Sequence, residues 1–404
     1  FADNATLQAL LNAGYQQTAG TFHNLTATTA NTVSGQFEAA LDRAHLKVSS
    51  GAFDYKSAVK SAVDSLADTM KYVTYPTGHT DTLEVAARRA VLTGVNQTGA
   101  KLQVARADEM GVEFFETTAH GGARPSHAEW QGRQFHRGGA VDYMGKHYPD
   151  FEAATGYGTG AGLCGWNCRH TFFSIFPELG PAPAWTQADL VALNARDIEY
   201  NGGKYTRYEI SQMQRARERT VRKYKRRYLA EDAAGADTTA SAVKLRQARQ
   251  ELSDFISATG GRADSARTSV AGFGRSEAGK ASYTARKQER FDSANVELQQ
   301  MREAGTIKAK GKLIESPPAP NEINFASEHV LQRWAERGMG PMDAERIIRS
   351  SKVAMSQRNG TQTCYYSEYG FVAIGQNGNV SSIGPLDEGG QKLMEVVKKH
   401  GIPH

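Results

Sequence analysis

Two cysteines and two histidines of this chain have the chemistry of zinc ligands. The stretch GLCGWNCRH contains Cys164, Cys168 and His170, and so holds two of only three cysteines in 404 residues. His127 lies upstream in TTAHGGARPSHAEWQGRQF, which also carries His120. Thiolates and neutral imidazoles are the preferred ligands of structural zinc, which takes four in a tetrahedron. One hypothesis is therefore a structural zinc site whose ligands are His127, Cys164, Cys168 and His170. His120 is a further possible ligand.

The spacing of these residues is also compatible with roles that involve no metal. The cysteines follow a C-x3-C-x-H pattern and not the C-x2-C pattern of common zinc knuckles. Both could instead be buried packing residues beside structural histidines. A disulfide is disfavoured, because so few cysteines are typical of a protein made in a reducing cytoplasm. A reactive thiol in an enzyme site would need a helix N-terminus or a nearby group to lower its pKa, and none is evident.

A second group of residues has the charge to bind nucleic acid. Residues 215–227 read RARERTVRKYKRR, whereas the formal net charge of the whole chain is only +5. On a helix, Arg215, Arg219, Arg222 and Arg226 share one face. With Lys223 they could bind DNA phosphates without sequence preference and with a strong salt dependence. The alternatives are an acidic surface of a partner protein and an ordinary solvated helix face.

A third group lies on a helix expected near the C-terminus. His329, Arg333 and Arg337 share one face of this helix. In metal-free RNA cleavage an imidazole moves the proton while guanidinium groups hold the scissile phosphate. Hydroxyls of the strands that follow, among them Thr363 and Ser382, could complete such a site. The alternative is an amphipathic helix with ordinary surface residues.

The elements that must position these groups fall into a multidomain pattern. Residues 1–110 are expected to be helical, with one helix over 56–71 and a long one over roughly 83–109 that ends near Gly111. Residues 111–185 are rich in Gly, Pro and aromatic residues, which indicates a small, loop-rich α+β domain. No run of about 18 apolar residues is present, so we expect no membrane segment.

The second half of the chain is expected to contain three further parts. Residues 186–305 are polar and helical, with a loop at 233–240 and a long flexible one at 258–282. Residues 306–320 are Pro-rich and are expected to form a linker. Residues 321–404 indicate an α+β domain with an antiparallel sheet. Its expected helices are 326–338, 343–351 and 387–399, and its expected strands are 361–367, 370–375 and 380–383.

Four ordered blocks of sequence resemble a known family of phage proteins. They read YPTGHTDTLEVAARRAVLTGVNQT, TTAHGGARPSHAEWQGRQF, YGTGAGLCGWNCRHTFFSIFPELG and QMQRARERTVRKYK. Together they resemble the tailed-phage minor capsid protein 2 family, relatives of the Mu F-like head morphogenesis proteins. The resemblance spans about residues 1–300, and it makes residues 111–185 a MuF-like domain.

This resemblance implies a location and a set of partners. It implies a virion protein at or near the portal vertex of the phage head, made in the host bacterial cytoplasm and present in multiple copies. Such a protein assists head morphogenesis or DNA packaging. The implied partners are the portal protein, the major capsid protein and phage genomic DNA.

The C-terminal part resembles a different group. Its His-x3-Arg-x3-Arg-Gly helix, second short helix and antiparallel meander are similar to barnase/EndoU/colicin/RelE-like (BECR) nucleases. This implies a toxin-like, metal-independent ribonuclease that acts on host RNA, as in MuF polymorphic toxins. The alternative is a purely structural protein that binds portal or capsid and contacts DNA, with a non-catalytic C-terminal module.

Overall fold

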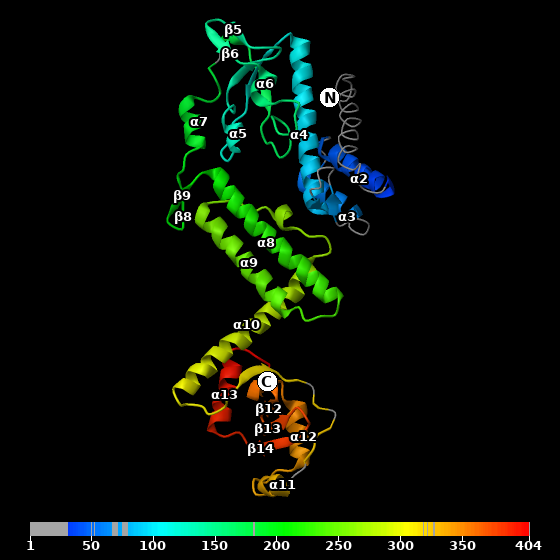
Figure 1. The fold of residues 1–404 in the computed structure, drawn as a ribbon, viewed down its shortest axis with the longest axis vertical. Coiled ribbons are helices and arrows are strands. Elements are labelled where there is room, and N and C mark those ends of the chain that lie inside the picture. The colour runs from blue at the N-terminus through cyan, green and yellow to red at the C-terminus, as the bar shows by residue number, and fades with distance from the viewer. Residues whose placement is uncertain are drawn as a thin grey trace. The chain divides into compact units, whose positions relative to one another are not determined.

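The computed structural model describes most of the chain as two compact units (Figure 1). Unit 1 comprises Phe1–Ala230 and Gln247–Arg275, and unit 2 comprises Glu231–Arg246 and Ser276–His404. The expected multidomain class is confirmed, with helical regions, a small loop-rich α+β part and a C-terminal antiparallel sheet. No helix among the described residues is long and apolar enough to cross a membrane. The described residues are 31–49, 51, 53–66, 72–74, 80–180, 182–317, 319–320, 322–325 and 328–403.

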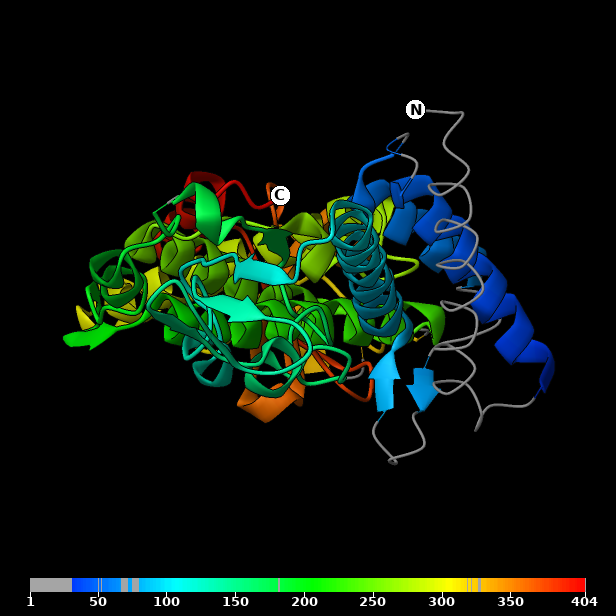
Figure 2. The same cartoon turned by 90° about the horizontal axis from the view of Figure 1, so that it is seen from above.

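Three helices and a strand pair form the first part of unit 1. The helices α2 (Asn31–Ser49), α3 (Tyr55–Leu66) and α4 (Leu83–Met110) pack around apolar residues that recur every three to four positions. The pair β1 (Tyr72–Thr74) and β2 (Thr80–Thr82) lies beside α4 (Figure 2). As expected, α4 ends at Gly111, whose left-handed φ of 66° caps the helix. The helix expected over 56–71 ends at Leu66, and residues 67–71 lie outside the described residues.

A small sheet forms the centre of the α+β part. Strand β3 (Phe114–Thr117) lies between β4 (Gln134–His136) and β7 (Phe172–Ser174). The core behind this sheet consists mainly of aromatic rings. This accounts for the high content of aromatic residues in the segment 111–185. The remaining short elements are α5 (Pro125–Ala128), β5 (Val141–Tyr143), β6 (Lys146–Tyr148) and α6 (Phe151–Thr155).

Two long helices follow, joined by the loop expected near 233–240. They are α8 (Arg207–Ala233) and α9 (Thr239–Thr259), and they follow α7 (Gln187–Leu193) and the pair β8 (Ile198–Tyr200) and β9 (Gly203–Tyr205). The flexible segment expected at 258–282 is shorter and is fixed in place. Helix α10 already begins at Arg275, and α8 holds the preceding loop through hydrogen bonds from Arg222 to the Arg267 carbonyl and from Lys225 to the Thr268 carbonyl.

Unit 2 contains a five-stranded antiparallel meander in the order β10-β11-β12-β13-β14. The three expected strands are present, and two further ones precede them. The first of these lies inside the segment 306–320 that was expected to be a linker. The strands are β10 (Lys312–Glu315), β11 (Val353–Gln357), β12 (Gln362–Ser367), β13 (Gly370–Gly375) and β14 (Val380–Gly384).

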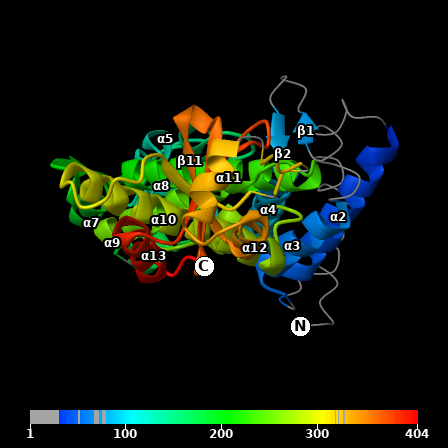
Figure 3. The ribbon, with the colours of Figure 1, turned by 90° about the horizontal axis from the view of Figure 1, so that it is seen from below.

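Helices cover both faces of this sheet (Figures 1 and 3). One face packs against α10 (Arg275–Glu303) and α13 (Glu388–Lys399), through residues that include Met355, Cys364 and Ala373. The other packs against α11 (Glu328–Ala335) and α12 (Pro341–Ser350). Because α10 and β10 share the core of the sheet, this unit begins upstream of residue 321.

Candidate functional site

The histidines and cysteines of unit 1 are brought together by a short helix and a glycine-rich loop. His127 lies on α5, which starts at Pro125, a residue suited to the first helical position. Cys168 and His170 end the loop that precedes β7. This loop folds closely on itself, because a Cβ atom at Gly162 would lie 1.9 Å from the carbonyl oxygen of Gly156.

Three of the four expected metal ligands converge. One potential ligand atom from each of His127, Cys168 and His170 forms a group in which all atoms lie within 4.8 Å of one another. Cys168 Sγ is 3.6 Å from His170 Nδ1. The ring centroids of His127 and His170 are 5.4 Å apart. No other group of this kind occurs in the described ranges.

Hydrogen bonds fix which nitrogen of each ring carries the proton. Gln131 Oε1 accepts from the backbone N–H of His120, so this amide atom is an oxygen, and it also lies 3.0 Å from His170 Nε2. Nε2 of His170 must therefore donate, which leaves the lone pair of Nδ1 directed at Cys168. His127 Nε2 likewise donates to the Ala161 carbonyl at 2.9 Å, so its Nδ1 keeps a lone pair.

Cys164, the fourth expected ligand, lies outside this group of three. Its backbone has a left-handed φ of 59°, and its thiol points to the carbonyl of His170 at 3.5 Å. It packs in the aromatic core with Phe115 and Phe172. Both cysteines belong to this core, but only Cys168 has its sulfur beside a histidine nitrogen.

Burial sets the protonation of the cluster. It is the main cause that lowers the pKa of His170 to about 3, with further contributions from His120, His127 and Arg124. Burial also raises the pKa values of the Cys164 and Cys168 thiols. Both cysteines are free thiols, so neither the disulfide nor the activated nucleophile considered above has support here.

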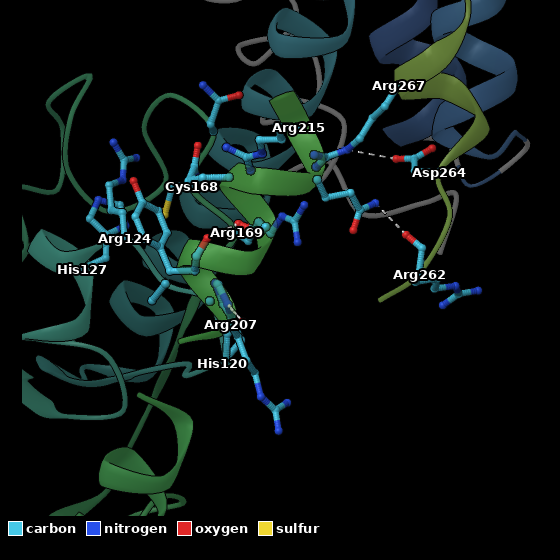
Figure 4. A pocket seen from close by; sticks show the side chains of 18 of the residues that line it. His120, Arg124, His127, Cys168, Arg169, Arg207, Arg215, Arg262, Asp264 and Arg267 are labelled. Carbon is cyan, nitrogen blue, oxygen red and sulfur yellow. Dashed lines mark hydrogen bonds and ion pairs between the residues drawn. The ribbon is translucent and has the colours of Figure 1, made fainter. Parts of the chain in front are cut away.

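The cluster forms one wall of a pocket with a volume of about 470 Å³ (Figure 4). His120 also lies in this wall, and its ring stacks on His170 with centroids 4.2 Å apart. Gly121 allows Arg207 to approach, because a Cβ there would lie 2.5 Å from the Arg207 side chain. Seven cationic side chains line the pocket, namely Lys56, Arg124, Arg169, Arg207, Arg215, Arg262 and Arg267.

These cations far outnumber the anions around them. Asp264 is the one carboxylate among the residues that line the pocket, and it lies 3.3 Å from Arg267 and 3.8 Å from Lys56. Burial, followed by repulsion from Arg267 and Arg169, lowers the pKa of Arg215. The buried carboxylate of Glu218 also lies 3.8 Å from Arg267, so two carboxylates stand against seven cations. The excess positive charge of the pocket favours an anionic ligand.

The basic segment of α8 is divided between the pocket, the interior and the surface. Arg215 lines the pocket, whereas Arg219 and Lys223 are exposed. Arg222 is buried and donates to the Arg267 carbonyl, and Arg226 pairs with Glu84 and Thr82. The last two are structural residues and not a free phosphate-binding surface, because their guanidinium groups are already bound inside unit 1.

The C-terminal candidates are only partly brought together. His329 and Arg333 lie in α11, but their side chains are outside the described residues. Arg337 donates to the Ile383 carbonyl at 2.8 Å. Thr363 pairs with Ile374 on the face covered by α11, whereas Ser382 pairs with Ala373 on the opposite face. Because side chains alternate along a strand, Ser382 cannot join a site below α11.

The pocket residues that the sequence did not reveal come from four separate segments. Lys56 lies on α3, Arg169 precedes His170, Arg207 begins α8, and Arg262 and Arg267 lie in the loop before α10. Gln131, the residue that orients His170, was also missed. The one local signal was the density of arginines around the histidine motifs.

The comparisons with known proteins give one result. A family model described as phage minor capsid protein 2 matches residues 1–257. No curated protein matches the chain significantly, and neither does any solved structure.

Proposed function

Because the chain belongs to the phage minor capsid protein 2 family, we propose that this structural protein of the virion acts at or near the portal vertex and holds phage DNA there through unit 1. The observation that carries the DNA contact is the pocket of unit 1, which is lined by seven cationic side chains and one carboxylate. Phosphates are the anions that a DNA-filled head supplies in greatest number, and arginine binds them in a bidentate manner.

The exposed part of α8 extends this contact. Arg219 and Lys223 follow Arg215 on successive turns, so a backbone that enters the pocket can also meet these two cations. Contacts of this kind go to phosphates and not to bases, which suits a protein that must hold any part of a genome. The partners in this proposal are genomic DNA, the portal protein and the major capsid protein, with multiple copies per virion. Cross-linking of intact virions tests the location: links to the portal protein are expected, and links to the major capsid protein alone would contradict it.

Charge reversal in the pocket tests the DNA contact. In the full chain, Arg169→Glu, Arg207→Glu and Arg262→Glu together should weaken binding to a random-sequence duplex. The negative slope of log K against log salt should also become less steep by about 3, because each phosphate contact contributes about 0.9 to its magnitude. Fluorescence anisotropy between about 50 and about 200 mM salt measures both quantities.

A matched control separates local from overall charge. Arg349→Glu, Lys352→Glu and Lys398→Glu change the net charge equally, and these three exposed residues lie in unit 2. This control should bind DNA almost as the unmodified chain does. Equal loss in both triple variants would mean that only net charge matters, and tighter binding of an acidic portal segment than of DNA would assign the pocket to a protein partner.

A second candidate function concerns the C-terminal module. Helix α11, which carries His329 and Arg333, packs over the sheet face that presents Thr363. We therefore retain a toxin-like, metal-independent ribonuclease of the BECR type, active on host RNA, as a proposal for unit 2. The competing proposal is a non-catalytic module that binds portal or capsid.

RNA cleavage by the full chain in the presence of a chelator distinguishes the two. A ribonuclease requires that His329→Ala abolish cleavage and that Thr363→Ala reduce it. Ser382→Ala is the control and should have no effect, because Ser382 lies on the other face of the sheet. Intact RNA after incubation with the unmodified chain would favour the non-catalytic module.

A further inference from the structure

We propose that His127, Cys168 and His170 bind one Zn²⁺ ion whose fourth coordination position opens into the arginine-lined pocket. The three metal ligands are independent of the DNA contact, since they are a different set of atoms, and only the anion at the fourth position rests on the proposed phosphate binding. Two imidazoles and one thiolate suit zinc among the common metal ions. The three residues are 2%, 9% and 1% exposed and lie together in the wall of the pocket.

The distance between two of the ligand atoms matches tetrahedral zinc, and all three lie within 4.8 Å of one another. With Zn–S near 2.3 Å and Zn–N near 2.05 Å, tetrahedral ligands place sulfur and nitrogen about 3.6 Å apart. Cys168 Sγ and His170 Nδ1 are 3.6 Å apart. Two imidazoles on one such ion have ring centroids about 5 Å apart. His127 and His170 have centroids 5.4 Å apart.

The hydrogen bonds around the ligands are those that zinc sites require. A metal-bound imidazole donates its other N–H to a carbonyl or carboxylate, which fixes the ring and its tautomer. His127 donates to the Ala161 carbonyl and His170 to the Gln131 amide oxygen. Both rings therefore present Nδ1 as a lone pair, and Cys168 lies beside one of these nitrogens.

The two neighbouring candidates are excluded as ligands by their geometry. The His120 ring stacks on His170 at 4.2 Å, which is closer than two imidazoles on one tetrahedral ion can lie. Cys164 lies outside the group of converging ligand atoms, and its thiol contacts the His170 carbonyl at 3.5 Å, whereas Cys168 lies beside His170 Nδ1. The protein thus supplies three ligands. The fourth position belongs to water or to an anion from the pocket, where the arginines favour a phosphate oxygen.

Metal content of the full chain tests the assignment. After treatment with a chelator and reloading, elemental analysis should find one zinc per chain. Cys168→Ser and His170→Gln should lose it, whereas Cys164→Ser, the matched control, should keep it. Gln131→Ala should weaken zinc binding about 10- to 100-fold, because Gln131 only orients His170. Circular dichroism and gel filtration confirm that each variant is folded.

Cobalt substitution tests the open position. The Co²⁺-loaded chain should show a thiolate-to-cobalt charge-transfer band that Cys164→Ser retains, and inorganic phosphate should shift the ligand-field bands. A folded unmodified chain that binds no metal would overturn the proposal. Two results would instead indicate a closed site with four protein ligands. One is loss of metal in Cys164→Ser, and the other is a cobalt spectrum that neither phosphate nor other anions able to displace bound water can change.

Discussion

Four buried or half-buried histidines of unit 1 have pKa values that are lowered mainly by burial, namely His45, His120, His127 and His170. His45 on α2 illustrates this outside the cluster, because it is 4% exposed and its Nε2 lies 3.1 Å from the hydroxyl of Thr98 on α4. Burial is the main cause that lowers its pKa below the ordinary value of 6.5. A charged imidazole at this position would lose its hydration, so burial favours the neutral form of His45.

The protonation of His45 predicts a pH dependence of stability. Its folded-state pKa is depressed, so the unfolded chain binds more protons once the pH falls below about 6.5. The stability is complete above that pH and is lost as the pH falls towards the folded-state pKa, by up to about 1.4 kcal/mol per pH unit. His45→Gln can still bond Thr98 and should remove this one-proton contribution.

Urea unfolding between about pH 7.5 and about pH 5.5 measures the effect. A chelator in all samples keeps metal binding out of the comparison. The free energy of unfolding of the unmodified chain should fall more steeply with decreasing pH than that of His45→Gln. Parallel curves for the two proteins would show that His45 titrates alike in both states.

At the scale of elements, a side chain of α10 protects the outer edge of the sheet in unit 2, which is formed by strand β10. The backbone of Leu313 is bonded on its outer side by one side chain of α10: Leu313 N–H donates to Asn295 Oδ1 at 2.7 Å, and Asn295 Nδ2 donates to the Leu313 carbonyl at 2.9 Å. Asn295 thereby replaces a neighbouring strand and protects the edge of the sheet. Leu313 itself is 1% exposed, so β10 belongs to the core.

Local patterns predicted most elements, whereas pairings over long sequence distances stayed hidden. Helix α4 and the last three strands follow from apolar periodicity, a capping glycine and the turn residues 376–379. Strand β10 has four residues beside a Pro-rich run, and its partner β11 begins 38 residues later at Val353. Nothing local distinguishes such a strand from a linker.

In the candidate sites, too, local sequence patterns indicated the residue types, whereas contacts over long sequence distances could not be predicted. Residue types and motif spacing indicated His127, Cys168 and His170, but the backbone turn at Cys164 decided which cysteine faces them. Arg226 has the helical position of a phosphate-binding residue, yet its partner Glu84 is 142 residues away. Side-chain pairing of this range depends on the tertiary fold and cannot be read from the sequence of α8 alone.

At the scale of the whole molecule, the two units have separate hydrophobic cores. Among the residues that the structure describes, each of the four hydrophobic clusters consists of residues from one unit, two clusters in unit 1 and two in unit 2. Segments that share a hydrophobic core unfold together, so a mutation in the core of one unit should change the stability of that unit and not of the other. The C-terminal module and the pocket-bearing unit are therefore expected to differ in stability.

Removal of the Asn295 clamp tests this independence. Asn295→Ala leaves the N–H and carbonyl of Leu313 without their partner, which should destabilise unit 2 by about 1–3 kcal/mol. Hydrogen exchange followed by mass spectrometry should then show faster exchange in β10 and β11, about 10-fold for each 1.4 kcal/mol. Peptides that contain β3 should be unchanged, because β3 belongs to unit 1. Gln300→Ala, at an exposed position of the same helix, is the control and should alter neither unit. Faster exchange in β3 of Asn295→Ala would mean that the two cores unfold as one.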